Sequence, residues 1–387
     1  MKRKPKLIRV TTINRSLNKL LEGQLSYMSQ HFDVIGVSSP DYTSKILRDR
    51  EKVEIVDLEM SRKISPLADL KSIWKMYRLF RQEKPNIVHS HTPKAGLVTM
   101  VAGYLARVPI RLHTIAGLPL ETSTGLKRKV LILVEKLVYK LSTITYPNSH
   151  GIKEFITENN LVSNEKVRII GYGSSNGIDL EHFKRTPELI DESEKIKNEI
   201  GVKSNEKVFL FVGRLVVDKG IEPLIIAWQK IAKKYNNIKL VLVGTYEGDL
   251  SPLPANVIKL IEESENILHL GYKMDVRPYF CLADYFVFPS YREGLPNVVL
   301  QAGALELPMI VTNINGNTDI VDEGVNGIIV EPKSSNELER AMEILLTDES
   351  IVSSLRSNAR KIIEEKYDRQ YLQKEILNEY KRLLKTQ

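Results

Sequence analysis

The stretch YFVFPSYREGLPNVVLQAG, residues 285–303, decides the fold. It starts as an apolar run of the length of one buried strand, passes through a charged turn with glycine and proline, and then takes up helical spacing. A strand that leads through such a turn into a helix is the building unit of parallel sheets. In open parallel sheets, ligands bind beyond the carboxyl ends of the strands. The turns after the apolar runs are therefore where function should be sought.

Short apolar runs alternate with longer helical patterns in both halves of the chain, which predicts two doubly wound α/β domains. The segment 185–207 is polar and lacks a buried strand, so the boundary is expected there. We expect one domain at residues 1–185, a second at 186–366, and a last helix at 367–387 that packs back on the first domain. Two such domains would face each other across a cleft. The expected strands are LIRVTTI 7–13, DVIGVSS 33–39, NIVHSH 86–91, IRLHT 110–114, TITYPNS 143–149, VFLFVG 208–213, KLVLVG 239–244, ILHLGY 267–272, DYFVFPS 284–290 and PMIVTN 308–313.

Composition excludes several classes of protein. The 387 residues are too many for one hydrophobic core, and 42% hydrophobic with 27% charged residues is typical of a globular protein. No apolar stretch reaches the roughly 18 residues that a membrane helix needs, and charge interrupts the opening MKRKPKLIRVTTINR too early for a signal peptide. A cytoplasmic protein is expected. Cys281 is the only cysteine, which excludes an internal disulfide and a metal site built from several cysteines.

Charge is distributed unevenly along the chain. Residues 1–180 hold 29 Lys and Arg against 16 Asp and Glu, a net of +13, and residues 181–387 hold 27 against 32, a net of −5. A basic half can meet nucleic acid, acidic lipid headgroups or a phosphorylated substrate. Aromatic residues interleaved at RNA-binding spacing are missing, so nucleic acid ranks last and no nucleic-acid partner is expected.

Two turns of the second half carry residues suited to an anion. After VFLFV comes GRLVVDKG, in which Gly213 lets the backbone turn while Arg214 and Lys219 supply positive charge before a helix. The alternative is that both cations are solvated surface residues.

In the second turn, Gly294 and Leu295 would offer backbone N–H groups at a helix N-terminus, and Glu293 and Gln301 could meet hydroxyl groups. The alternative for Glu293 is an acid that only complements the helix dipole. The two turns together describe a site for a phosphorylated, hydroxyl-rich ligand.

Several separated segments resemble the retaining glycosyltransferases of family 4, which have the two-domain GT-B fold and include bacterial capsule, O-antigen and lipid-linked oligosaccharide transferases. GRLVVDKG, the segment LGYKMDVRPYFCLADYFVFPSYREGLPNVVLQAGALELPMIVTNINGNTDIV and GVNGIIVEP are similar to that family's donor domain, over most of residues 205–335. In the first half, HSHTPKAGLVTMVAGYLARVPIRLHTIAGLP, YPNSHGIKEFI and NGIDLEHF also resemble it. The resemblance implies two Rossmann-like domains.

The resemblance assigns roles on the donor side. It implies that Arg214 and Lys219 bind the diphosphate of a nucleotide sugar, with UDP favoured over GDP, and that Glu293 holds the sugar. The N–H groups of Gly294 and Leu295 would hold the phosphates. Gln301 stands where the family commonly has a second glutamate for the ribose, and an amide can accept from one hydroxyl and donate to another. The donor-side residues implied in this way are Gly213, Arg214, Lys219, Tyr272, Lys273, Glu293, Gly294, Leu295 and Gln301, of which Arg214, Lys219 and Glu293 are also expected to act in catalysis.

No Asp-x-Asp triplet occurs in the sequence, which argues against a transferase that holds the diphosphate through a divalent cation. We therefore expect no metal and no cofactor. Positive side chains and a helix end would stabilise the leaving diphosphate while the acceptor hydroxyl attacks from the same face.

In the first half, His113 matches the family's histidine near the reacting sugar and is expected to be catalytic. The alternative is a structural hydrogen-bonding histidine. His89 and His91 have no third metal ligand nearby, which disfavours a metal site. Lys94 and Gly96 are placed on the acceptor side, as are Asn14 and Arg15, where many relatives have two glycines after the first strand.

The segment GLKRKVLILVEKLVYKL, residues 125–141, is a candidate membrane-surface helix. Its apolar face consists of Leu131, Val134, Leu137, Val138 and Leu141. With the basic first half, it favours an acceptor glycan on a polyprenyl diphosphate and peripheral association with the anionic inner face of the cell membrane. The alternative is a helix packed inside the first domain.

Three rival functions stay open or are disfavoured. A catalytically silent nucleotide-sugar binding module is raised by Gln301. A sugar-nucleotide epimerase shares the expected fold, but it needs several acid/base carboxylates and histidines around the sugar, and the motifs here look more like those of transferases. A nicotinamide dehydrogenase is disfavoured because GYGSSNG, residues 171–177, lacks the dinucleotide-binding spacing and does not follow the first strand.

Overall fold

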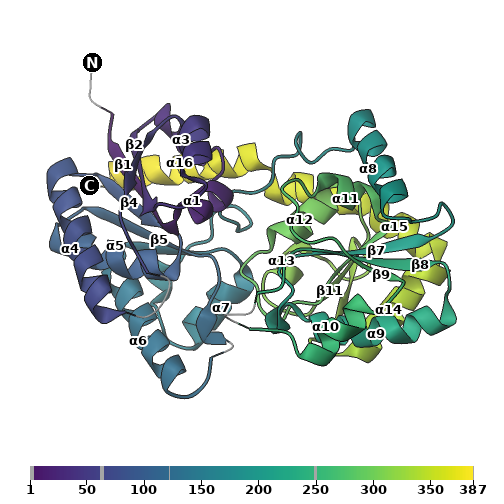
Figure 1. Ribbon diagram of the computed structural model, residues 1–387. Coiled ribbons are helices and arrows are strands. Elements are labelled where there is room, and N and C mark those ends of the chain that lie inside the picture. The colour runs from purple at the N-terminus through teal and green to yellow at the C-terminus, as the bar shows by residue number, and fades with distance from the viewer. Residues whose placement is uncertain (1–3, 62–64, 122, 248–250, 387) are drawn as a thin grey trace. The chain divides into compact units, whose positions relative to one another are not determined.

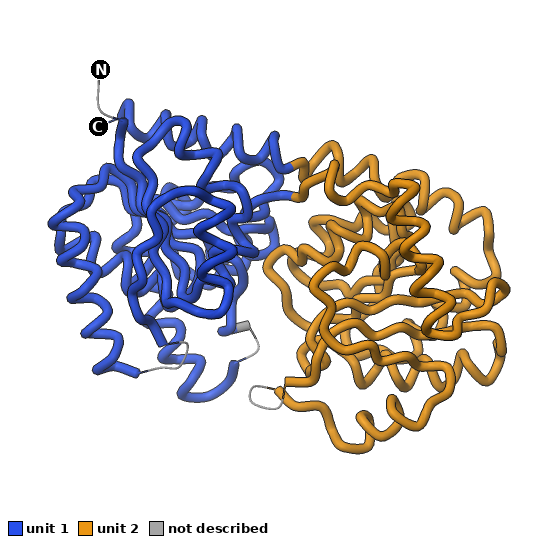
Figure 2. The backbone as a smooth tube through the Cα atoms, turned by 45° about the horizontal axis from the view of Figure 1, so that its top comes forward, with its two compact units in different colours: residues 1–177, 369–387 blue, residues 178–368 orange. Residues whose placement is uncertain are grey.

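The computed structural model describes residues 4–61, 65–121, 123–247 and 251–386, which fold into two compact units. Unit 1 comprises residues 1–177 and 369–387, and unit 2 comprises residues 178–368 (Figure 2). The chain passes into unit 2 eight residues before the boundary expected from composition. Ile178 and Phe183 explain this, because both are buried in the core of unit 2.

Unit 1 is built on a six-stranded parallel sheet with the order β3-β2-β1-β4-β5-β6 (Figure 1). The sequence reverses direction across the sheet between β1 and β4, as in doubly wound folds. β4 and β5 pair in register, with Ser90 opposite His113. The strands are β1 Lys6–Ile13, β2 Asp33–Ser39, β3 Glu54–Asp57, β4 Ile87–Ser90, β5 Ile110–Ile115 and β6 Ile144–Pro147.

Helices cover both faces of this sheet. One face, with Ile8, Val10 and Val88, packs against α4, α5, α6 and α7. The other, with Leu7, Ile87 and others, packs against α1, α2, α3 and the C-terminal helix α16. The helices are α1 Asn14–Leu20, α2 Gln24–Ser29, α3 Ser44–Glu51, α4 Pro66–Glu83, α5 Pro93–Leu105, α6 Gly125–Leu141, α7 His150–Glu158 and α16 Arg369–Lys385.

The C-terminal helix α16 belongs to unit 1. Its buried residues Leu372, Ile376, Tyr380 and Leu383 are spaced so that they share one helix face, and they join the core with strand residues such as Leu112. The helix α16 thereby joins α1, α2 and α3 in covering this face of the sheet.

The apolar face predicted for membrane contact on α6 packs instead inside unit 1. Leu131, Val134, Val138 and Leu141 all contact the core beneath α6, and only Leu137 of the predicted face is exposed. The prediction for this face is therefore wrong. The physical reason is that α6 lies along α5 and must bury one apolar stripe to complete the layer of helices.

Unit 2 repeats the architecture with a parallel sheet of order β12-β11-β10-β7-β8-β9. Its strands are β7 Lys207–Val212, β8 Ile238–Val243, β9 Ile267–His269, β10 Tyr285–Phe288, β11 Met309–Thr312 and β12 Gly327–Val330. Its helices are α8 Pro187–Glu199, α9 Ile221–Lys234, α10 Ala255–Glu262, α11 Arg277–Leu282, α12 Asn297–Ala304, α13 Asn317–Ile320, α14 Ser335–Thr347 and α15 Glu349–Tyr367. The predicted α/β class with two doubly wound sheets is confirmed.

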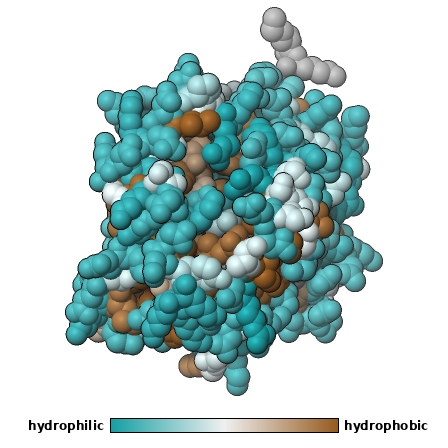
Figure 3. Space-filling view, turned by 90° about the vertical axis from the view of Figure 1, so that its right-hand side faces the viewer, coloured by the Kyte–Doolittle hydropathy of each residue, from teal (hydrophilic) through white to brown (hydrophobic). Residues whose placement is uncertain are grey.

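The sequence prediction missed two strands, β3 and β12. Both have four residues and both are edge strands, which pair on one side only. The surface that Figure 3 presents is mostly hydrophilic, with apolar residues in small groups. Among the described helices, none is long and apolar enough to cross a membrane.

Candidate active site

Two loops meet at the carboxyl edge of the sheet in unit 2, one after β7 and one after β10. The β7 loop contains a short 3-10 helix, Val217–Lys219, and ends at Gly220, where α9 begins. Gly220 has a φ of +68°, and a Cβ atom there would clash with the carbonyl oxygen of Pro289. The backbone N–H of Tyr291 donates to the carbonyl oxygen of Asp218 at 2.9 Å. Glycine at this position therefore lets the two loops come this close.

The contact between the loops brings Lys219 and Glu293 together. Lys219 Nζ and Glu293 Oε1 form an ion pair, with each side chain 15% exposed. Ser290 Oγ donates to the same carboxylate oxygen at 2.7 Å, and the ammonium lies 5.1 Å from the centre of the Phe288 ring. An ammonium has three donors and a carboxylate has two oxygens. The pair therefore keeps capacity to bind phosphate and hydroxyl groups.

The turn between Glu293 and α12 offers backbone donors. Among the contacts of the described residues, the N–H groups of Gly294 and Leu295 take part in no hydrogen bond. The loop after β11 packs directly on this turn, because Gly316 has a φ of +83° and a Cβ atom there would clash with the Gly294 carbonyl oxygen. A helix N-terminus with open N–H groups attracts an anion. The arrangement fits the phosphate site that the sequence predicts here.

Arg214 has a partner from another loop. The N–H of Gly213 donates to the Val243 carbonyl oxygen at 2.9 Å, which ties the start of the β7 loop to β8. The Arg214 guanidinium then pairs with Glu247, with Nη1 and Oε2 2.7 Å apart, and half of the arginine side chain is exposed. The structure thus brings Lys219 to Glu293 and Arg214 to Glu247.

Three other predicted donor-side residues lie on the surface of unit 2. Tyr272 and Lys273 follow β9; Tyr272 is exposed, and Lys273 Nζ lies 5.7 Å from the centre of the Tyr279 ring. Gln301 lies on the partly exposed side of α12, whose other side is buried. Their contacts with a donor stay predictions.

In unit 1, the predicted acceptor-side residues are engaged with protein groups. Asn14 is fully buried, donates to Ser44 Oγ at 2.7 Å and accepts from the Ser38 hydroxyl. The backbone N–H of Arg15 donates to Asp41 at 2.7 Å. Lys94 Nζ lies 2.5 Å from an Asp69 carboxylate oxygen, with both side chains 12% exposed. The Asn14 amide therefore bonds to protein groups at the start of α1, and the Lys94 ammonium is paired with Asp69. The contacts of these residues with an acceptor stay predictions.

His113 lies inside unit 1, with 2% of its surface exposed. Its Nδ1 is 2.9 Å from Ser90 Oγ, and a Cβ atom at Gly96 would lie 2.6 Å from its Cε1 atom, so α5 packs directly on the ring. Burial lowers the pKa of His113 to about 4, so the imidazole is neutral at physiological pH. This placement agrees with the structural alternative, while its catalytic role stays a prediction.

The rings of His89 and His91 lie against each other, with their centres 4.1 Å apart and their planes tilted by 34°. His89 Nδ1 is 2.6 Å from the Tyr380 hydroxyl and Nε2 is 2.7 Å from Thr114 Oγ1, so both nitrogens have protein partners. Within the described part of the chain, no group of three His, Cys, Asp or Glu side chains could hold a metal ion.

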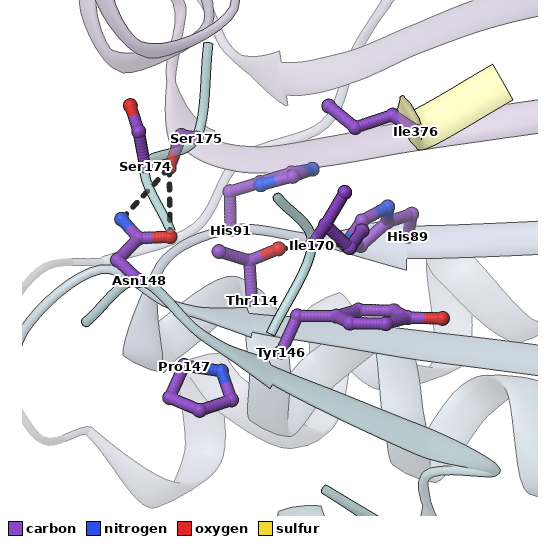
Figure 4. Close-up of a pocket in the computed structure, with 10 residues that line it drawn as sticks. All are labelled: His89, His91, Thr114, Tyr146, Pro147, Asn148, Ile170, Ser174, Ser175 and Ile376. Carbon is purple, nitrogen blue, oxygen red and sulfur yellow. Dashed lines mark hydrogen bonds between the residues drawn. The ribbon is translucent and has the colours of Figure 1, made fainter. Parts of the chain in front are cut away.

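The sequence did not predict a small cavity, lined by both polar and apolar residues, at the carboxyl edge of the sheet in unit 1 (Figure 4). Its volume open to water is about 10 Å³, room for about one water molecule. Beside the cavity, Arg9 is fully buried. Its Nη2 atom lies 2.8 Å from His91 Nε2 and donates to Gln24 Oε1. The signal in the sequence was an arginine inside the apolar run LIRVTTI. The lining residues are His89, His91, Thr114, Tyr146, Pro147, Asn148, Ile170, Ser174, Ser175 and Ile376.

Comparison with known proteins assigns both halves of the chain. Residues 192–362 match the family described as glycosyl transferases group 1, and residues 24–173 match the glycosyl transferase 4-like domain. The chain is 34% identical to the capsular polysaccharide biosynthesis glycosyltransferase CapM of Staphylococcus aureus, over 98% of each chain. It is 33% identical to the UDP-Gal:alpha-D-GlcNAc-diphosphoundecaprenol alpha-1,3-galactosyltransferase of Escherichia coli, over 78% of this chain and 76% of the other.

The fold is also that of a solved structure, Anabaena Alr3699/HepE in complex with UDP and glucose. The TM-score is 0.80 at 18% identity, with 97% of this chain and 99% of the other covered. Together with the two matched regions, these similarities identify the chain as a glycosyltransferase that belongs to family 4 and has the GT-B fold.

Proposed function

We propose that this glycosyltransferase moves a sugar from a UDP-sugar to a glycan carried on a polyprenyl diphosphate, in the synthesis of a surface polysaccharide. The observation that carries the proposal is the meeting of Lys219, Glu293 and the start of α12 at one strand edge of unit 2. The names of the relatives support the substrates: one acts in capsular polysaccharide biosynthesis, and the other takes UDP-Gal and a GlcNAc-diphosphoundecaprenol acceptor.

On the donor side, Lys219 and the N–H groups of Gly294 and Leu295 would bind the diphosphate, and Glu293 would accept from sugar hydroxyls. The Ser290 hydroxyl and the Lys219 ammonium fix one oxygen of Glu293 and leave the other for the ligand. Arg214 would join the diphosphate by exchanging Glu247 for phosphate oxygens. Its half-exposed side chain has the freedom for that exchange.

The reaction we infer retains the configuration of the sugar. The bond from C1 to the diphosphate oxygen breaks and its electron pair leaves with the diphosphate. The acceptor hydroxyl then forms a new bond to C1 on the same face, and its proton passes to the departing phosphate oxygen. Negative charge grows on the diphosphate, so Lys219, Arg214 and the helix start would lower the barrier without a divalent cation.

The acceptor is proposed to lie in the inner face of the cell membrane, which requires the protein to work in the cytoplasm at that surface. A polyprenyl chain keeps the diphosphate and its glycan at the bilayer interface. The net charge of +13 in residues 1–180 favours approach to such an anionic surface.

The test is turnover with a panel of UDP- and GDP-sugars and a short-chain prenyl-diphosphate glycan, read by mass spectrometry. We expect a product one sugar heavier with a UDP-sugar, and its loss with Glu293→Gln, which keeps the shape of the side chain. Product with GDP-sugars alone would contradict the proposed donor.

A second candidate, the silent binding module, is favoured by one observation, Gln301 in place of the usual glutamate. It would give saturable UDP binding that Lys219→Met abolishes, with no product from any donor. An epimerase would instead convert the UDP-sugar without an acceptor, which the same mass-spectrometric assay detects after chromatographic separation of the isomers.

A further inference from the structure

The outward face of α6 combines apolar and basic side chains. Leu126 is 77% and Leu133 68% exposed, and Val130 and Leu137 are also exposed. These positions recur every three or four residues, so they share one side of the helix, opposite the stripe that packs in the core. Exposing a second apolar stripe to water is unfavourable for an isolated unit, and exposed apolar side chains gathered on one face mark interaction sites.

Lysines accompany this outward face. Lys129, Lys136 and Lys140 are exposed on the same side of α6, and Lys127 lies at its start. The only acidic residue of α6, Glu135, is buried on the inward side. The outward face of α6 is therefore apolar and positive throughout.

The helix α4 has a face of the same kind. Leu67 is 84%, Leu70 63% and Trp74 57% exposed, at spacings of three and four residues. Lys71 and Arg78 are exposed beside them, and the Arg78 guanidinium lies 4.8 Å from the centre of the Trp74 ring. An aromatic ring next to cations on an apolar stripe is typical of side chains that sit at a membrane interface.

Acidic groups close to α4 are already paired. Asp69 lies against Lys94 at 2.5 Å, and both are nearly buried. Glu59 pairs with Lys75 at 3.6 Å. Neither cancels Lys71 or Arg78.

The fold places these two faces at the same edge of unit 1. α4 and α6 each precede a strand of the parallel sheet and both flank α5, so both run against the strand direction. Their N-terminal halves, which carry Leu67, Leu70, Leu126 and Lys127, therefore lie toward the carboxyl ends of the strands. Figure 1 shows the starts of both helices on the same side of unit 1.

We propose that Leu67, Leu70, Trp74, Leu126, Val130 and Leu133, called here the α4–α6 surface, dock unit 1 on an anionic lipid bilayer. The apolar side chains enter the headgroup region, and Lys71, Arg78, Lys129 and Lys136 meet lipid phosphates. The surface differs from the α6 face expected from the sequence. The proposal rests on the proposed function in one respect, since a polyprenyl-linked acceptor lies in such a bilayer.

The experiment is sedimentation of the full chain with vesicles of phosphatidylcholine, with and without phosphatidylglycerol, at low and high salt. We expect binding that requires phosphatidylglycerol and weakens with salt. The double variant Lys129→Ala, Lys136→Ala should bind about 30-fold more weakly, at about 1 kcal/mol for each basic residue near the surface. Leu126→Ser with Leu133→Ser should lose about tenfold or more.

Matched control variants distinguish binding through this surface from non-specific binding to vesicles. Ile46→Ser removes an exposed apolar side chain from α3, on the other side of the sheet, and should leave binding unchanged. Lys195→Ala with Lys233→Ala removes two exposed lysines of unit 2 and should do the same, apart from a small effect of net charge. Loss of binding in either control, equal to that of the α4–α6 variants, overturns the proposal.

Trp74 provides a direct reading. The chain has two tryptophans, and Trp228 is buried with its indole N–H donating to Asn266. Vesicles should shift the fluorescence of Trp74 to the blue, and brominated lipid should quench it, in the natural chain and not in Trp74→Phe. No quenching would overturn the insertion of this side chain.

Two further outcomes distinguish membrane docking from self-association of the chain and from the proposed enzymatic function. If Leu126→Ser with Leu133→Ser changes the oligomeric state and leaves vesicle binding intact, the surface joins copies of this chain and the proposal fails. If the natural chain turns over no donor but binds anionic vesicles as expected, the proposed function fails while the docking surface stands.

Discussion

The carboxyl edges of the two sheets carry charged and polar residues that behave in opposite ways. In unit 2, Lys219 and Glu293 come from separate loops, pair with each other and stay partly open to solvent. In unit 1, Asn14 and His113 turn inward and bond to neighbouring protein groups. Two sheets of the same topology thus differ at their edges: the candidate site of unit 2 keeps donors and acceptors available, whereas Asn14 and His113 of unit 1 bond to the protein itself.

The difference follows from the turns that carry these residues. Gly220 and Gly316 let three loops of unit 2 pack backbone against backbone, which leaves the side chains and N–H groups at the rim. In unit 1, β1 passes into α1 at Asn14 without a glycine, so the side chain itself must hold the junction together. An open site therefore needs the glycine turns as well as the charged residues.

The largest effect should come from removing the cation of the open site. Lys219→Met keeps the length of the side chain and takes away the charge that would stabilise the leaving diphosphate. We expect kcat to fall by about 10² to 10³, or roughly 3–4 kcal/mol of transition-state stabilisation. Initial rates with saturating UDP-sugar and acceptor measure it.

Lys207→Met is the matched control, because Lys207 lies at the exposed start of β7 and pairs with Asp284 at 3.3 Å. Its kcat should stay within a factor of two or so, as for other exposed pairs. If Lys219→Met retained a third of the natural rate, the open edge of unit 2 would not be the catalytic site.

The next effect concerns the loop contact on which the open site depends. Gly220→Ala must place a Cβ atom against the Pro289 carbonyl oxygen at a φ of +68°, whereas Gly201 has a φ of +72° with no atom within 4 Å of such a Cβ. We expect Gly220→Ala to lower the free energy of unfolding by about 3 kcal/mol and Gly201→Ala by about 1 kcal/mol. Urea unfolding of the full chain compares them when both variants are made in a Trp74→Phe background, so that the fluorescence reports Trp228 of unit 2 alone.

The affinity for UDP provides a second measurement that compares Gly220→Ala with Gly201→Ala. Gly220→Ala should weaken it, because Lys219 and Glu293 belong to the two loops that the glycine joins, while Gly201→Ala should not. Equal losses of stability in the two variants would mean that the close approach at Gly220 contributes nothing beyond its backbone conformation.

Much of the fold could be predicted from the sequence because the central strands are buried on both sides. Runs such as VFLFVG and KLVLVG are almost continuously apolar, which is typical of strands in a parallel sheet that helices cover on both faces. The missed strands β3 and β12 lie at the edges, where partial exposure of EIVD and GIIV removes the continuous apolar signal. The apolar stripe on α6 was predicted from its spacing, but it was assigned to the membrane surface instead of the protein core. Helical periodicity shows that one face is apolar and does not show whether protein or lipid covers that face.

The site was predictable where it depends on residues close in sequence. Glu293, Gly294 and the start of α12 lie within one turn of chain, so their proximity follows from the sequence order. The partners of Arg214 and Lys94, which are Glu247 and Asp69, are brought in by tertiary packing and left no local signal. The residue types therefore show where the charged side chains lie in the sequence, but they do not show which partner each one pairs with in the fold.

His113 gives a test of the inward-turned edge that does not depend on activity. Burial lowers its pKa from 6.5 to about 4, so between these values the unfolded chain takes up a proton that the folded one refuses. Stability from this group is complete above pH 6.5 and is lost as the pH falls. We expect a loss of about 2 kcal/mol between pH 7.5 and pH 5 that is missing in His113→Gln.

Burial lowers the pKa of His89 and His91 as well, and both residues remain in the variant. The contribution of His113 is therefore the difference between the losses of unfolding free energy in the natural chain and in His113→Gln. Urea unfolding at each pH measures it. If the natural chain and His113→Gln lose stability in parallel, the imidazole takes up a proton without unfolding. His113 would then belong to an edge as open as that of unit 2.

The smallest effect should come from Gln301, which lies on the partly exposed side of α12 in unit 2. A carboxylate accepts from two ribose hydroxyls where an amide accepts from one, and charged hydrogen bonds are the stronger. Gln301→Glu should therefore lower the KM for the UDP-sugar about three- to fivefold, under 1 kcal/mol, with kcat unchanged, because ribose contacts are equal in the ground and transition states.

Asn297→Asp is the control for added charge, since it lies one turn earlier on the same exposed side of α12 and closer to the expected diphosphate. It should leave the KM unchanged or raise it by repulsion. A rise in KM for Gln301→Glu as well would place phosphate, not ribose, beside residue 301. The nucleotide would then lie along α12 in the opposite direction, and the open edge of unit 2 would have to be assigned anew.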